Sequence, residues 1–272
     1  MFKPTGQITT LRQLVGRLEA TGPGGPQTYF SLSLPEIHCH LPGPGLPCGA
    51  LHEVMAAAHG DTPASFGFSL ALMSCALEAR GGPAFLVLSR QAADFGKPYG
   101  HGLRQLGFDV GRLLLVETRS GKDALWAMEE ILRAGSGVAA VAGMIETDID
   151  LTMSRRLSLS ASSGNTPLVL LRPSGATGTS AAITRWRVAA APAARDHFDS
   201  FAGWRWQVAL ERCRQGRAGQ WMLEWDHAAH RFRLAEIVAH RAVSPRPGQP
   251  PAVNRAIGND RSAAPLRSGV AR

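Results

Sequence analysis

A stretch containing glycine, threonine and serine at residues 60–69 has the residue types that phosphate-binding loops use. It follows the apolar run Leu51–Met55, and a loop between a strand and a helix can hold phosphates with its backbone N–H groups. In the best register with the motif G-x-x-x-x-G-K-[ST], the four key positions hold Thr62, Gly67, Phe68 and Ser69. Two of these positions fail, and the lysine that meets the β and γ phosphates is missing. We therefore predict a degenerate nucleotide loop, made of Gly60, Thr62, Gly67, Phe68 and Ser69.

The acidic residue that would help to hold Mg²⁺ is also displaced. The apolar run Val138–Ile145 passes through Gly143 without a carboxylate, and Glu146 follows three residues after that glycine. An ATPase would have to combine Ser69 and Glu146 with a lysine from elsewhere in the chain, such as Lys97 or Lys122. We expect no catalytic residue, no metal and no cofactor, and keep this ATPase as the alternative.

The histidines and cysteines do not form a recognisable site. His38, Cys39 and His40 stand near Cys48, but the spacing matches no common zinc pattern, and alternate side chains of an extended segment point to opposite sides. His52 lies inside a predicted strand and is expected to be a hydrogen-bonded core residue. The sequence order supports no Ser/His/Asp or Cys/His arrangement.

Positive charge is concentrated in the second half of the chain. Residues 1–150 hold 11 Lys/Arg against 14 Asp/Glu, whereas residues 151–272 hold 18 arginines against 7 Asp/Glu. Arginine forms two-pronged hydrogen bonds with phosphates and carboxylates, so this half is expected to bind DNA or an acidic partner. The alternative is a solvated basic surface without a partner. Trp186 could stack on a base, but a tryptophan in an alternating strand is more often a core residue. The candidate contacts are Arg155, Arg156, Arg172, Arg185, Arg187, Arg212, Arg214 and Arg217.

The pattern of apolar residues predicts an α/β fold with a mostly parallel sheet and helices on both faces. Continuous apolar runs indicate buried parallel strands at 51–55, 84–88, 113–116, 138–145 and 168–171. Helical patterns lie between them at 66–80, 94–106, 121–134 and 152–162. Alternating patterns after Pro173 predict antiparallel strands at 183–188, 204–212 and 220–225.

Both ends of the chain differ from this core. Residues 7–20 carry one apolar stripe at helical spacing, in which Leu11, Leu14, Val15 and Leu18 form a candidate protein interface. The Gly/Pro-rich stretch 21–49 is expected to be a connecting arm without a helix or a central strand. The tail after about residue 243 is rich in Pro, Arg and Ala and is expected to be disordered. No secretion signal or membrane span is recognisable, so we expect a cytoplasmic protein.

Several of these segments resemble the RecA superfamily. The stretch Gly45–Val54 is similar to the entry into the ATPase core of RecA recombinases. The stretches 164–172, 173–181 and 182–188 resemble, in the same order, a late strand, the second DNA-binding loop and a returning strand. With the degraded phosphate loop and the segments 204–214 and 219–226, the chain is similar to the ImuA family of bacterial inducible-mutagenesis accessory proteins.

This resemblance implies an organisation and a role. Together with the patterns at the two ends, it divides the chain into an N-terminal helix and arm (1–44), a RecA-like core with C-terminal antiparallel strands (45–242) and a tail (243–272). It implies a non-catalytic adaptor in error-prone translesion synthesis during the SOS response. The implied partners are ImuB, an error-prone C-family DNA polymerase, RecA and single-stranded DNA. The alternative is an ATP-dependent DNA-binding protein of recombination or repair. The uncharged loop 173–181, and Arg90 near the position of the catalytic glutamate of RecA, do not fit that alternative.

Overall fold

The computed structural model describes residues 27–92, 95–135, 137–195 and 201–235. The predicted N-terminal stripe Leu11, Leu14, Val15 and Leu18 and the tail 243–272 lie outside the described residues. The described part contains a nine-stranded sheet in the order β13-β12-β11-β8-β3-β7-β6-β4-β5. The strands from β8 to β5 pair in parallel and those from β8 to β13 pair antiparallel. The predicted α/β class, with a mostly parallel sheet and antiparallel C-terminal strands, is confirmed.

Most elements fall where the apolar patterns predict them. The strands of the sheet are β3 (Leu51–Ala56), β4 (Ala84–Ser89), β5 (Leu113–Thr118), β6 (Ala140–Met144), β7 (Leu168–Arg172), β8 (Thr184–Ala190), β11 (Arg205–Cys213), β12 (Gly219–Asp226) and β13 (Arg231–Leu234). The main helices are α3 (Thr62–Ala79), α4 (Gly100–Gln105), α5 (Gly121–Arg133) and α6 (Leu151–Ser163). A further pair of short strands, β9 (Ala194–Arg195) and β10 (Phe201–Gly203), stands apart from the large sheet.

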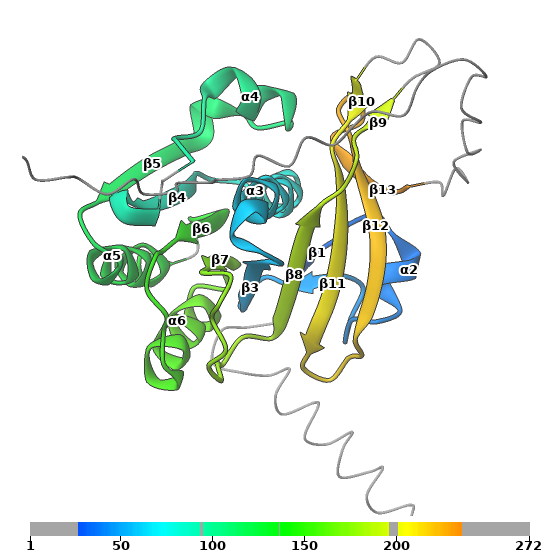
Figure 1. Cartoon of the computed structure of the whole chain (residues 1–272). Helices are drawn as coiled ribbons and strands as arrows, with labels where there is room; N and C mark the ends of the chain where they lie inside the picture. The colour runs from blue at the N-terminus through cyan, green and yellow to red at the C-terminus, as the bar shows by residue number, and fades with distance from the viewer. Residues whose placement is uncertain (1–26, 93–94, 136, 196–200, 236–272) are drawn as a thin grey trace, which may run out of the picture. The chain divides into compact units, whose positions relative to one another are not determined.

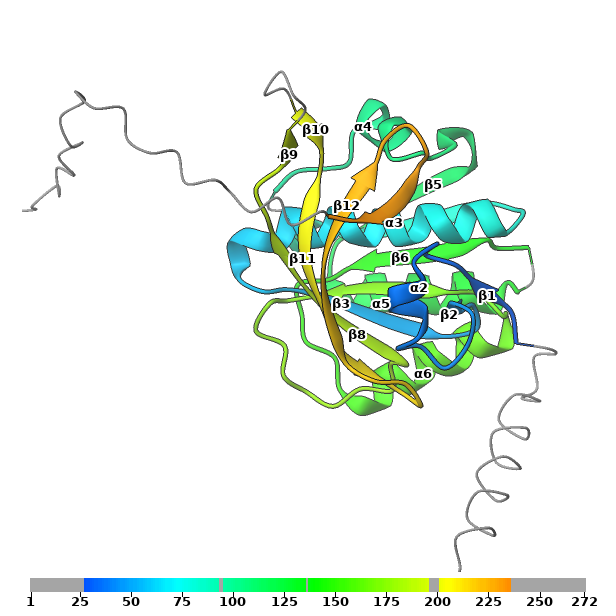
Figure 2. The ribbon, with the colours of Figure 1, turned by 90° about the vertical axis from the view of Figure 1, so that its right-hand side faces the viewer.

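The helices lie on both faces of the sheet, as predicted (Figure 1). On one face α3 packs against β3, β6, β7 and β8, and on the other face α5 and α6 pack together beneath the parallel strands. Figure 2 shows α3 passing behind β11 and β12, the strands that contribute Trp206 and Trp225 to the core around Phe68. Two hydrophobic cores result, one on each side of the parallel strands.

The stretch 21–49 corrects one expectation, because its described part is more than a connecting arm. Short strands β1 (Tyr29–Phe30) and β2 (Leu46–Pro47) pair antiparallel, and Pro35–His38 forms one helical turn, α2. The helical turn is possible because Pro35 stands at its first residue, where a missing N–H costs nothing. The arm also buries six large apolar side chains in the core: Phe30, Leu32, Leu34, Ile37, Leu41 and Leu46.

The helix predicted at 94–106 is also shorter than expected. Regular helix is limited to α4, Gly100–Gln105. Gly96 adopts a positive φ of 94°, and Pro98 follows two residues later, so the chain ahead of α4 cannot continue as a helix.

Candidate functional site

The loop between β3 and α3 is the segment for which the sequence predicts a degenerate nucleotide loop. It leaves the carboxyl end of a central parallel strand, makes a 3-10 turn at His59–Asp61 and enters α3 at Thr62. The Asp61 carboxylate turns back into this loop and accepts the backbone N–H groups of Ala58 (3.1 Å) and Ala190 (2.9 Å). The Asp61 side chain therefore satisfies one N–H group of the loop itself and one at the end of the neighbouring strand β8.

The predicted register of the nucleotide loop is wrong. Thr62 is the first residue of α3, and Gly67, Phe68 and Ser69 lie in the following turns of the same helix, so only Gly60 belongs to the loop itself. The Phe68 side chain is fully buried, and the Ser69 hydroxyl donates to the carbonyl of Ser65 (2.8 Å).

The residues at the start of α3 are Gly60, Asp61 and Thr62. A glycine before the helix and a hydroxyl residue at its first position are features of the motif, but the residue between them is an acid and not a lysine. The chain therefore carries a negative charge at the start of α3.

The other residues of the ATPase alternative are not brought to this loop. Lys97 pairs with Glu117 of β5, the strand at the end of the sheet, and Lys122 lines a hollow between α5 and α6. Glu146 follows β6 and accepts the N–H of Gly121 at the start of α5 (2.8 Å). Burial raises the pKa of Glu146, but the hydrogen bonds from Ser89, its own N–H and Gly121 outweigh this effect and leave the pKa below its usual value. Glu146 is therefore placed to stabilise the first turn of α5.

One of the predicted surface arginines is buried. The Arg172 side chain has no exposed area and pairs with the equally buried Glu53 (2.8 Å), with Asp148 as a second partner. Arg185 pairs with the other oxygen of Glu53 (2.9 Å) and is 14% exposed. Charges of this kind persist in a protein interior only when they are paired. Arg172 cannot meet a phosphate on the surface, and we remove it from the candidate contacts.

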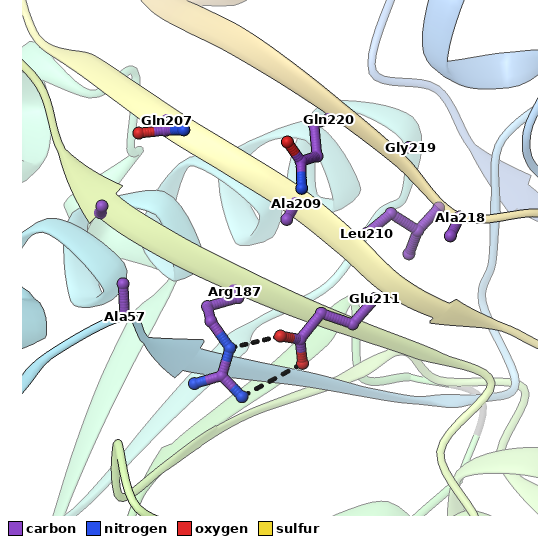
Figure 3. Close-up of a pocket in the computed structure, with 10 residues that line it drawn as sticks. Ala57, Arg187, Gln207, Ala209, Leu210, Glu211, Ala218, Gly219 and Gln220 are labelled. Carbon is purple, nitrogen blue, oxygen red and sulfur yellow. Dashed lines mark hydrogen bonds and ion pairs between the residues drawn. The ribbon is translucent and has the colours of Figure 1, made fainter.

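Arg187 is also committed to a carboxylate. Its guanidinium forms a two-pronged pair with Glu211 on the face of the sheet that α3 does not cover (Figure 3). Beside the pair lies a hollow of about 550 Å³ with small residues such as Ala209 and Gly219 along it. The pairs Arg205–Glu224 and Arg233–Asp226 continue this pattern across β11, β12 and β13. On this face Arg187, Arg205 and Arg233 are therefore each paired with a carboxylate of the same sheet.

The remaining predicted arginines have different surroundings. Arg156 pairs with Glu129 (2.6 Å), and Arg212 donates to the carbonyl of Ser180 (3.0 Å). Arg155 on α6 and Arg214 and Arg217 on the β11–β12 hairpin are exposed, and the ion pairs among the described residues do not include them.

Two aromatic side chains of the region belong to the core. Trp186 is fully buried and its indole N–H donates to Thr184 Oγ1 (2.9 Å), so it offers no stacking face. His52 is also fully buried, 2.8 Å from Thr184 Oγ1 and 2.9 Å from the carbonyl oxygen of Pro47. Burial lowers the pKa of His52 to about 4. The prediction of a hydrogen-bonded core histidine is confirmed.

The His/Cys segment has structural contacts. His38 Nε2 lies 3.3 Å from the N–H of Leu32, and His40 Nδ1 lies 2.8 Å from the carbonyl oxygen of Ala218. His38 lies in the helical turn α2, so the extended geometry assumed for this segment is wrong. Throughout the described ranges, no three His, Cys, Asp or Glu side chains converge as metal ligands would.

Sequence reasoning missed the Glu53 network, although a signal for it exists. Glu53 interrupts a predicted fully buried strand, Arg172 directly follows a second predicted strand and Arg185 stands in a third. A buried acid requires a partner, and the sheet order places β7 and β8 on either side of β3. Only the strand order, which the sequence patterns do not contain, identifies the partners.

Comparison with known proteins identifies relatives of the whole core. No family model matches the chain. Two curated proteins named Protein ImuA, from Caulobacter vibrioides strains NA1000/CB15N and ATCC 19089/CB 15, are each 37% identical to the chain over 235 residues. The match covers 80% of this chain and 93% of each relative. In the part of the chain with described structure, no helix has the length and apolar character of a membrane span. Because the identity of 37% extends over most of this chain and of both relatives, the chain belongs to the ImuA family.

Proposed function

We propose that this protein is a non-catalytic adaptor of error-prone translesion DNA synthesis, acting in the cytoplasm during the response to DNA damage. It keeps a RecA-like arrangement of strands and helices without the nucleotide chemistry, and it acts by binding other proteins. Its expected partners are ImuB and, through ImuB, an error-prone C-family DNA polymerase, with RecA and single-stranded DNA as further candidates. Membership of the ImuA family supports the pathway.

The observation that carries the non-catalytic part of the proposal is the loop between β3 and α3. Asp61 stands directly before α3, and its carboxylate already accepts the N–H groups of Ala58 and Ala190. A nucleoside triphosphate approaching this loop would meet a negative charge in place of a positive one. Like charges a few ångströms apart cost free energy even in a solvated site, so binding of ATP is disfavoured before hydrolysis is considered.

A thermal-unfolding experiment tests this part. A ligand present at about 100 times its Kd and bound only to the folded state adds about 2.7 kcal/mol of stability, which shifts the Tm of a protein this size by roughly 5–10 °C. We expect 2 mM MgATP to leave the Tm unchanged, with RecA as the positive control. A shift of several degrees would restore the ATPase alternative.

Co-purification tests the adaptor part. Tagged ImuB is expected to retain the protein equally well with MgATP, with MgADP and without nucleotide. Retention that requires ATP, or no retention at all, would contradict an adaptor that works without nucleotide.

An ATP-dependent DNA-binding protein of recombination or repair is the second candidate, favoured by the exposed Arg155, Arg214 and Arg217. Phosphate contacts release counterions, so affinity for single-stranded DNA would fall steeply between 50 and 200 mM salt. Binding of a labelled oligonucleotide that needs ATP and shows this salt dependence would favour the second candidate over the adaptor.

A further inference from the structure

A groove of about 530 Å³ opens at the end of the sheet where the parallel strands begin, opposite the β3–α3 loop. Gly49 and Ala50, just before β3, line its base, and α6 forms one side with Leu159. Tyr29 and the β11–β12 hairpin, with Arg214, complete the lining. We call this hollow the N-edge groove. Its base lies close against α6, since a Cβ atom at Gly49 would stand 3.3 Å from Ser162 Cα.

The N-edge groove carries an exposed apolar side chain. Leu159 is 70% exposed and lines the groove, where it is accompanied by the partly buried Tyr29 and Ile183. A single exposed leucine is ordinary on a protein surface, but this one belongs to a hollow that has further apolar lining. Removing apolar surface from water is favourable, so an apolar side chain of a partner would gain from lying against Leu159.

The charge around the groove has one sign. None of the residues that line it is acidic, and Arg214 is among them. Arg155 precedes Leu159 by one helical turn on α6, so both side chains lie on the same exposed side of that helix. Elsewhere in the second half, Arg172, Arg185 and other strand arginines are neutralised by carboxylates. Arg155 and Arg214 take part in none of the ion pairs described above.

The occupant that fits is an acidic peptide with an apolar side chain, supplied by another protein. The chain's own ends are a poor match in charge, because residues 1–26 hold 3 Lys/Arg against 1 acidic residue and residues 236–272 hold 6 against 2. Single-stranded DNA fits less well, because its sites combine cations with open aromatic faces. The aromatic residue here, Tyr29, has one side closed by the chain at Gly43, where an added Cβ would lie 2.6 Å from the ring.

We infer that the N-edge groove is a docking site for an acidic, extended segment of a partner protein, whose carboxylates pair with Arg214 and Arg155 and whose apolar side chain covers Leu159. This inference rests on the proposed adaptor function and assigns a surface to it. The groove lies at the edge of the sheet away from the β3–α3 loop, so docking there does not involve nucleotide.

Fluorescence anisotropy with synthetic probes tests the inference on the full-length protein. The first probe is a labelled 12-residue peptide with four Asp/Glu and two Leu; the second replaces Leu by Ser; the third replaces Asp/Glu by Lys; the fourth is a labelled (dT)20 oligonucleotide. We expect the first probe to bind, the second to bind at least fivefold more weakly and the third not to bind. Arg214→Glu and Leu159→Glu should each weaken the first probe at least fivefold.

Matched controls separate the groove from general charge effects. Arg104→Glu changes an exposed arginine on α4, and Met153→Glu places the same acid on α6 but in the hollow toward α5. Both variants should bind the first probe as the unmodified protein does, and an unchanged Tm would confirm that all four variants fold. The inference is overturned if no acidic peptide binds, or if the groove variants and the controls behave alike. It is equally overturned if (dT)20 binds through Arg214 while the peptides do not.

The failure of this inference can be told apart from failure of the proposed function. Damage-induced mutation frequency is measured in a bacterial strain that carries the gene of this protein in place of its own ImuA gene. If Arg214→Glu loses peptide binding but supports full mutagenesis, the groove is not the docking site, while an ATP-independent adaptor stands. If even the unmodified protein does not support mutagenesis and is not retained by ImuB, the adaptor function itself fails.

Discussion

His52 allows a stability prediction whose size follows from the structure. Its Nε2–H can donate only to the carbonyl oxygen of Pro47, so Nδ1 is left as the acceptor for the hydroxyl of Thr184. Trp186 donates to the same hydroxyl oxygen, which completes a chain of hydrogen bonds built around a neutral imidazole. A proton added to Nδ1 would displace the hydroxyl hydrogen of Thr184 from its acceptor, and burial lowers the pKa of the ring to about 4.

The pKa of His52 therefore lies below the value of about 6.5 that histidine has in an unfolded chain. Between these two values the unfolded chain binds one more proton than the folded protein, so stability falls as pH falls from 6.5 to 4. With 1.36 kcal/mol per pKa unit the full loss is about 3 kcal/mol, and about 2 kcal/mol of it is expected between pH 7 and pH 5.

Urea unfolding at pH 7 and pH 5, compared between the natural protein and His52→Gln, measures this loss. The glutamine amide can still donate and accept but does not titrate. Groups common to both proteins, including Glu146 and His38, contribute equally and cancel in the comparison. We expect the natural protein to lose about 2 kcal/mol more than the variant between these pH values. Equal losses would refute the assignment of a buried neutral His52.

Three further outcomes are expected. Glu53→Gln should lower the free energy of unfolding in urea by about 3–5 kcal/mol, because it leaves Arg172 buried with a weaker set of partners. Glu211→Gln on the open face should lower it by at most about 1 kcal/mol. Equal losses would contradict the buried network. Asp61→Ala should lower the free energy of unfolding by about 1 kcal/mol. It should create no ATP binding, as judged by the Tm with and without nucleotide. Leu114 is 46% exposed on the edge strand β5, so Leu114→Lys should reduce light scattering at high protein concentration, and an unchanged signal would argue against association through that edge.

The strands that sequence patterns predicted best are the ones buried on both faces. Runs such as Leu168–Leu171 are continuous because helices cover both sides of a parallel strand, and the structure places β7 there. The pattern failed for β13, where Arg231 and Arg233 flank the buried Phe232 in a strand of four residues. It failed also for the arm, where the Gly and Pro content predicted a loop although Phe30 and other side chains are buried. Local composition describes the backbone well but does not show which surface a segment packs against.

The candidate site was predictable in kind but not in detail. The sequence shows that a motif lysine is missing, yet it placed Phe68 at the lysine position because Gly67 and Ser69 happen to flank it. In the structure α3 begins at Thr62, directly after a 3-10 turn, so Gly67, Phe68 and Ser69 all lie inside the helix. The arginines show a similar limit, since Arg172 and Arg214 are equivalent in the sequence and opposite in exposure.

Asp61 also explains how the loop can persist without a ligand. A phosphate-binding loop presents several backbone N–H groups toward one point, and such groups need an acceptor. Here the Asp61 carboxylate is that acceptor for Ala58 and for Ala190 of the neighbouring strand β8. Asp61 thus supplies, within the chain, the negative charge that a phosphate would bring. These two hydrogen bonds therefore support the proposal of an adaptor that binds other proteins without nucleotide.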